Sequence, residues 1–289
     1  MLADRALTLS TLVRTFPIRM GLTWTMTLGE TALMALIPLF IGFAIDGLLE
    51  NSLRELWELA ALLALLVAVA VIRRVYDTRV YSAIRVELGR AQAARGARQP
   101  ISTLNAQIGM GRELVEFLEE TLPMVLTGLT QLTIALVILY TFSPVLAASA
   151  GLAAMSAVLT YALFHRQFYR LNSDLNVQME KQINALEQRG LRHATAHFLK
   201  LRRTEVRISD SEAALYGLIF VVLLGLVLFN IWHATTALAA TTGAIFAIVS
   251  YSWDFVDGTI TLPATLQNWT RLTEIMRRIN ATEAVGAMS

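Results

Sequence analysis

The stretch TMTLGETALMALIPLFIGFAIDGLLE, residues 25–50, decides the fold class of this chain. It is long, apolar and helical in rhythm, and several similar runs follow it. A bilayer core of roughly 30 Å requires about 20 apolar residues per helix, so each run is long enough to cross a membrane. Only 16% of the residues are charged, whereas soluble domains carry about 25%. We therefore expect an all-α integral membrane protein.

The hydropathy pattern predicts six transmembrane helices joined by unequal connections. The predicted spans cover about residues 20–48, 57–72, 122–142, 144–164, 213–232 and 237–262. The connections after the second and fourth spans are long, charged and rich in helix formers, so we expect the helices to continue past the membrane. An amphipathic segment, 1–19, precedes the transmembrane domain, 20–280, and a short tail, 281–289, follows it.

The placement of basic residues predicts the orientation. Of the 24 Lys and Arg residues, all but Arg54 lie in the N-terminal segment, the two long connections or the C-terminal end. The positive-inside rule then places both termini and both long connections in the cytoplasm. The basic stretch 189–203 indicates contact with anionic membrane lipid rather than with nucleic acid.

Several kinds of chemistry are not expected. The chain has no cysteine, which excludes disulfides and cysteine-ligated metals. Its sequence contains no Gly-x-x-x-x-Gly-Lys-Ser/Thr phosphate loop. We expect no enzymatic activity, no cofactor and no metal site.

Four motifs resemble those of a known family. IPLFIGFAIDGLL (37–49) is similar to the end of its first span, and GRELVEFLEETLPMVL (111–126) to the helix leading into span three. TTGAIFAIVSYSWDF (241–255) is similar to its Gly-centred opening of span six, and RLTEIMRRIN (271–280) to the helix that feeds an ATPase domain. Their order and topology resemble the transmembrane domain of exporter-type ABC transporters along nearly the whole chain. The resemblance implies a homodimer with spans four and five exchanged between subunits, and transport by alternating access.

The sequence departs from that family where an ATPase would be engaged. The sequence ends at residue 289, near where the ATPase domain would begin, and segments 98–111 and 185–198 lack the usual contact motifs. In this respect it is similar to ATPase-less, proton-driven peptide uptake transporters. We therefore expect proton-coupled transport of a peptide, siderophore or drug-like solute across the bacterial inner membrane. The alternatives are a permease subunit that uses a separate ATPase and a transport-inactive scaffold or regulator.

Glu30 is the first candidate for coupling protons or binding substrate. Counting from Met20 at about 1.5 Å per residue places it near mid-membrane, where a charge costs about 2.5–3.5 kcal/mol. A desolvated carboxyl group is able to load and release a proton. The alternative is a neutral carboxyl group hydrogen-bonded to a neighbouring helix. Asp46 lies near the outer surface, and the resemblance implies a structural role for it at a helix end.

Asp254, Asp257 and Gln131 are the remaining candidates. Asp254 and Asp257 are three residues apart and share a helix face, which suits a proton relay or a cationic substrate. Counted from Ala237, Asp254 is expected to lie nearer the cytoplasmic surface than Glu30. The alternative for both is a hydrated inner vestibule. Gln131 either lines a path or hydrogen-bonds a neighbouring helix.

Overall fold

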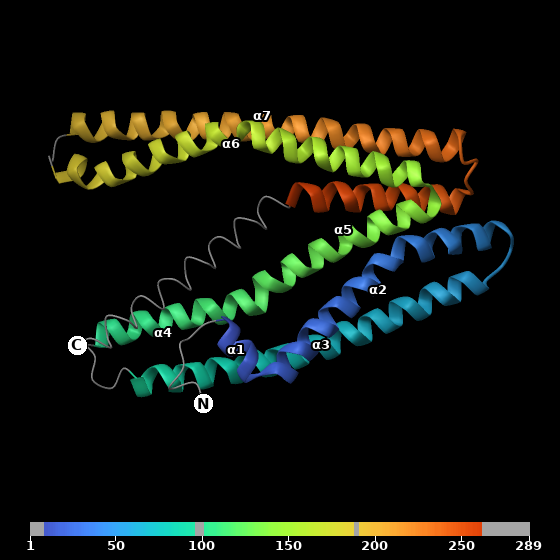
Figure 1. Cartoon of the computed structure of the whole chain (residues 1–289), viewed down its shortest axis with the longest axis horizontal. Helices are drawn as coiled ribbons and strands as arrows, with labels where there is room; N and C mark the ends of the chain where they lie inside the picture. The colour runs from blue at the N-terminus through green and yellow to red at the C-terminus, as the bar shows by residue number, and fades with distance from the viewer. Residues whose placement is uncertain (1–8, 96–100, 188–190, 262–289) are drawn as a thin grey trace. The chain divides into compact units, whose positions relative to one another are not determined.

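The computed structural model describes residues 9–95, 101–187 and 191–261 (Figure 1). The elements are α1 (Leu9–Thr15), α2 (Pro17–Leu49), α3 (Arg54–Arg95), α4 (Ile101–Glu116), the π-helical turn η2 (Phe117–Thr121), α5 (Leu122–Phe142), α6 (Pro144–Glu187) and α7 (Leu191–Thr236). A further helix covers residues 242–261. The expected all-α fold is confirmed over these ranges. The predicted helix at 271–280 and the tail at 281–289 lie outside the described residues.

Five helical stretches are long and apolar enough to cross a membrane. They are Pro17–Leu49, Arg54–Ala94, Gly111–Phe142, Pro144–Met179 and Ala194–Thr236. They contain the first five predicted spans. The helix over 242–261 coincides with the sixth predicted span but is not one of the five. Asp254 and Asp257 dilute its apolar character, so the sixth crossing stays a prediction.

Three of these helices are far longer than a membrane crossing requires. α3 has 42 residues, α6 has 44 and α7 has 46. At 1.5 Å per residue each extends roughly 60–70 Å, about twice the thickness of a bilayer core. The charged connections after the second and fourth predicted spans are therefore largely helical continuations of those spans, as the sequence predicted.

The chain divides into two compact units, Met1–Ile138 with Ala239–Ser289, and Leu139–Leu238. In the first unit α2 and α3 form an antiparallel hairpin that turns through residues 50–53 (Figure 1). Asn51 in this turn has a φ of 61°, a left-handed conformation that asparagine tolerates better than most residues. Away from the turn, α3 packs against α4, η2 and the start of α2. The core there consists of Met20, Val80, Tyr81, Ile84, Leu88, Ala91, Leu114, Val115, Phe117 and Leu118.

The helix over residues 242–261 packs directly on α2. A Cβ atom built on Gly42 would lie 2.6 Å from the carbonyl oxygen of Gly243, so the two backbones cross at a distance that only glycine permits. Farther along, the Tyr251 hydroxyl donates a 2.7 Å hydrogen bond to the carbonyl oxygen of Ala35. Residue numbers fall along α2 as they rise along its neighbour, so the two helices are antiparallel.

Asp46 holds the start of that helix. Its Oδ1 accepts a 2.8 Å hydrogen bond from the Gly243 amide, and its Oδ2 accepts one of 2.5 Å from the Thr241 hydroxyl. Thr241 Oγ1 in turn accepts a 3.2 Å bond from the Ala244 amide. A carboxylate at a helix N-terminus satisfies free amide donors and complements the helix dipole. The expected helix-end role of Asp46 is confirmed. Asp46 itself lies on α2, and the helix whose end it caps is the one over 242–261.

In the second unit α6 and α7 lie side by side as an antiparallel hairpin (Figure 1). Polar side chains link them across an otherwise apolar seam. The Ser149 hydroxyl donates a 2.8 Å hydrogen bond to Asn230 Oδ1, and Gln167 Nε2 donates one of 2.8 Å to Ser211 Oγ. Such bonds between small polar side chains are typical of helix pairs in membranes.

Candidate functional site

Glu30 is paired with an arginine from the neighbouring helix. Arg73 on α3 donates from Nε to Glu30 Oε2, and from Nη2 to Glu30 Oε1 at 3.4 Å. The same guanidinium donates from Nη1 to Asp77 Oδ2 at 3.0 Å. Arg73 and Asp77 are one helical turn apart, so α3 presents both to the same side. One arginine therefore serves two carboxylates, and we call these three residues the α2–α3 charge cluster.

The α2–α3 charge cluster is largely withdrawn from solvent. The side chains of Glu30, Arg73 and Asp77 are 15%, 26% and 12% exposed. With both carboxylates ionised the cluster carries one net negative charge. A largely buried ion pair contributes little net stability, but removing one partner leaves an uncompensated charge at high cost. Uptake of one proton would bring the cluster to zero net charge.

The two carboxylates are not equally satisfied. Both oxygens of Glu30 face Arg73, whereas Asp77 Oδ1 is buried and makes no hydrogen bond of normal geometry with a described residue. The neighbouring Thr23 hydroxyl and the Trp24 Nε1 group are buried in the same condition. Buried polar atoms without a partner are uncommon in native proteins, and each one calls for a specific explanation. Asp77 is therefore the carboxylate of the cluster whose oxygens are less fully hydrogen-bonded.

The hairpin geometry gives the distance of Glu30 from the turn. Glu30 and Arg73 each lie about 20 residues from the turn at 50–53, which is roughly 30 Å of helix. This distance is about the thickness of a bilayer core. Because α2 has 33 residues, more than a single crossing requires, the depth of Glu30 stays a prediction.

Gln131 lies on the helix that contacts α2 beside Glu30. Thr31 Oγ1, on the next residue of α2, lies 3.2 Å from Thr127 Oγ1 of α5. Gln131 follows Thr127 by one helical turn, so both lie on the same side of α5. Gln131 is half-buried, and its role stays a prediction.

The two aspartates lie level with Glu30 rather than below it. In the antiparallel register set by the glycine crossing, Glu30 is opposite residues 254–257 of the neighbouring helix. α5 reaches the same level, because a Cβ atom on Gly258 would lie 3.0 Å from Leu132 Cδ1. Measuring each span from its own start had placed Asp254 nearer the cytoplasm than Glu30. Helix packing instead brings all four candidates to one level of the first unit.

Sharing a level does not give these residues the same partners. The side chains of Asp254 and Asp257 are exposed, and neither forms an ion pair with any residue in the described ranges. The Thr261 hydroxyl on their helix bonds to backbone carbonyl oxygens at 3.0 and 3.1 Å. Within the described ranges the two aspartates therefore have no ion-pair partner, whereas Glu30 is paired with Arg73.

Arg73 and Asp77 are the functional candidates that sequence analysis missed. They stand at the start of a charged segment, where solvated side chains are the ordinary expectation. Their spacing of four residues was visible, and so was their position directly after an apolar run. Nothing in the linear sequence, however, indicated that Glu30, 43 residues earlier, would face them.

Comparison with known proteins identifies the family. The model of the ABC transporter transmembrane region matches residues 9–243, which is most of the chain. A search of curated proteins found no similar sequence.

Proposed function

Because the chain belongs to the family of ABC transporter transmembrane regions, we propose that it forms the solute pathway of a transporter in the bacterial inner membrane. The pathway opens alternately to each side, and both termini face the cytoplasm. Its solute is a peptide, a siderophore or a drug-like molecule. The chain itself catalyses no reaction and holds no cofactor.

The driving force in this proposal is a proton gradient. The observation that carries it is the sharing of Arg73 by Glu30 and Asp77, which leaves one carboxylate in excess at a site largely closed to water. Burial disfavours an excess charge, so one proton relieves the site. The two carboxylates share one arginine, so a change in the charge of one alters the contact that Arg73 makes with the other.

Asp77 Oδ1 takes the proton in this mechanism. It is buried and makes no hydrogen bond of normal geometry with a described residue, and the Thr23 hydroxyl lies close enough to interact with the Asp77 carboxyl group. Protonation weakens the bond from Arg73 Nη1 to Asp77 and leaves Arg73 with Glu30 alone. Protonation of Asp77 therefore changes the hydrogen bonds that Arg73 of α3 makes, including those to Glu30 of α2. Asp254, Asp257 and Gln131, at the same level, line the solute path.

Transport by the reconstituted chain tests the proton role. Proteoliposomes are given a pH gradient without ATP, and movement of a labelled tripeptide and of Hoechst dye is followed. We expect Asp77→Asn and Glu30→Gln to lose most of the gradient-driven movement. Glu58→Gln is the matched control, because Glu58 forms an exposed pair with Arg54 near the hairpin turn. If Asp77→Asn and Glu30→Gln both keep the wild-type rate and pH dependence, the proton role is wrong.

The second candidate is a permease subunit that works with a separately encoded ATPase. The family assignment itself favours it, because transmembrane regions of this kind couple to ATPases. A stoichiometric ATPase that co-purifies from native membranes, with transport that needs ATP, would establish this candidate over proton coupling. If neither ATP nor a pH gradient moves any probe, the chain acts as a transport-inactive scaffold or regulator.

The proposed assembly is a homodimer in which the α6–α7 hairpin packs on the partner. The separate compact unit formed by Leu139–Leu238 supports this exchange, and α6 carries large exposed apolar side chains such as Leu159 and Leu163. Because the chain has no cysteine, a single Leu159→Cys change reports on this face. We expect it to form a crosslinked dimer in membranes, whereas Leu53→Cys at the hairpin turn should not.

A further inference from the structure

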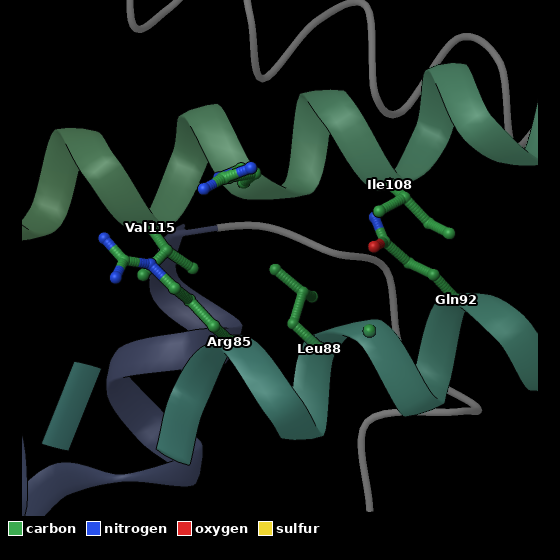
Figure 2. Close-up of a pocket in the computed structure, with 7 residues that line it drawn as sticks. Arg85, Leu88, Gln92, Ile108 and Val115 are labelled. Carbon is green, nitrogen blue, oxygen red and sulfur yellow. The ribbon is translucent and has the colours of Figure 1, made fainter. Parts of the chain in front are cut away.

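A pocket of about 230 Å³ lies between α3 and α4, in the part of the first unit away from the hairpin turn. In Figure 2, Arg85, Leu88 and Gln92 reach from α3 toward α4, with Arg85 and Gln92 at opposite ends. Ile108 and Val115 face them from α4, and Arg112 completes the polar lining. The pocket thus combines two guanidinium groups and an amide with an apolar wall.

The two arginines have donors to spare. Arg85 uses Nη2 to pair with Glu119 of η2, and a guanidinium carries five N–H donors. Arg112 is exposed and forms no ion pair with a residue in the described ranges. Arginine binds phosphate through two parallel hydrogen bonds, which favours it over lysine at such sites. The pocket therefore offers a concentrated positive charge that Glu119 only partly balances.

Gly89 keeps the space open. It lies inside α3, where glycine is less favourable than alanine. A Cβ atom built on Gly89 would meet nothing within 4 Å, so no packing contact in the described chain requires glycine there. Gly89 lines the pocket, and a side chain at this position would occupy it.

The pocket adjoins the part of the protein expected at the membrane surface. Its lining residues Leu88 and Val115 belong to the buried core of the first unit, and Val13 and Phe16 pack on the same core. Val13 belongs to α1 and Phe16 follows it directly, in the segment expected to lie on the membrane. Because the pocket and this segment share one core, a lipid headgroup and a soluble phosphate are both candidate sources of an anion held here.

We propose that the α3–α4 pocket binds a phosphate group, with Arg85 and Arg112 as its charged ligands. The phosphate comes from a membrane lipid or from a soluble phosphate compound. The apolar wall of Leu88, Ile108 and Val115 accommodates the carbon atoms attached to it. This site is separate from the α2–α3 charge cluster and does not depend on the transport proposal.

Two binding experiments on the purified full-length protein test the site and distinguish the sources. Native mass spectrometry measures binding of phosphatidic acid, with diacylglycerol of the same acyl chains as the lipid that lacks phosphate. Isothermal titration calorimetry measures binding of inorganic phosphate, with chloride at equal ionic strength as the control. Saturable binding of phosphatidic acid without binding of inorganic phosphate identifies a lipid as the source. Saturable binding of inorganic phosphate identifies a soluble phosphate compound.

Four variants tie the binding to the pocket. We expect Arg112→Gln to weaken binding about tenfold, as the loss of one charge-assisted hydrogen bond implies. Gly89→Leu should abolish binding by filling the pocket. Glu119→Gln should strengthen binding severalfold, because it removes the carboxylate that competes for Arg85. Arg90→Gln is the matched control, since Arg90 pairs with Glu87 on α3 and does not line the pocket.

Arg112→Gln should weaken phosphate binding and Glu119→Gln should strengthen it, so a loss of folding does not explain both results. A variant that merely unfolds loses binding, but only the proposed site gains it when Glu119 is neutralised. The proposal is overturned if neither probe binds the wild-type protein. It is also overturned if Arg112→Gln and Glu119→Gln bind as the control does.

Discussion

Replacing Arg73 with glutamine should destabilise the protein more than replacing either of its acidic partners. In the wild type the α2–α3 charge cluster carries a net charge of minus one, with each carboxylate in contact with Arg73. Arg73→Gln leaves Glu30 and Asp77 facing each other with no cation. Glu30→Gln or Asp77→Asn instead leaves one intact pair and no net charge.

The magnitude follows from the burial of the three side chains. Breaking a fully buried pair costs about 3–5 kcal/mol, whereas an exposed pair contributes about 0–1 kcal/mol. The exposures of 15%, 26% and 12% lie between these cases but nearer the buried one. We expect Arg73→Gln to cost about 2–3 kcal/mol and Glu30→Gln about 1 kcal/mol or less. The double variant Arg73→Gln with Glu30→Gln should be more stable than Arg73→Gln alone, because it removes one of the two unpaired carboxylates.

Unfolding of the purified protein in mixed micelles, titrated with sodium dodecyl sulfate and followed by circular dichroism, measures these differences. Arg54→Gln serves as the control, because the Arg54–Glu58 pair is 82% and 45% exposed, and it should leave the transition unchanged. The reasoning is refuted if Arg73→Gln is no more harmful than Glu30→Gln. It is equally refuted if the double variant loses as much stability as the two single changes combined.

The remaining predictions concern packing around the same helices. Gly42→Ala should cost at least about 2 kcal/mol in the same unfolding assay because its Cβ would overlap a backbone carbonyl. Gly29→Ala on the same helix, where a Cβ meets nothing within 4 Å, should be neutral or stabilising. Asp46→Ala removes the cap of the helix over 242–261 and should cost about 1 kcal/mol, seen as faster hydrogen exchange at its first amides; unchanged exchange would contradict the capping role. Tyr81→Phe removes the 2.8 Å hydrogen bond to the Leu118 carbonyl and should cost about 1 kcal/mol, with faster exchange at that turn; an unaltered transition would show that the bond contributes nothing.

Prediction of the candidate site from sequence was partial for a physical reason. An acidic residue in an apolar run is conspicuous because burial of a lone charge is costly. Glu30, Asp254 and Asp257 were therefore identifiable from their positions in the sequence. Arg73 and Asp77 were not, because charged residues in a long charged helix are ordinary. Counting residues from the start of a span assumes where the membrane begins, so the depth of Glu30 in the membrane stays a prediction. Long helices such as α2 and α3 leave that point undefined.

The amino-acid sequence alone is enough to assign the class of this protein. Apolar run length, the distribution of Lys and Arg, and the scarcity of helix breakers are local properties, and they predicted the helices, the first five spans and the helical extensions. The tertiary structure was needed to learn which side chains meet. It paired Glu30 with Arg73, joined Asp46 to Thr241, 195 residues later and just before the helix over 242–261, and set Gly42 against Gly243. Helix register depends on contacts between residues far apart in the chain, and hydropathy carries no information about which face of one helix meets which face of another.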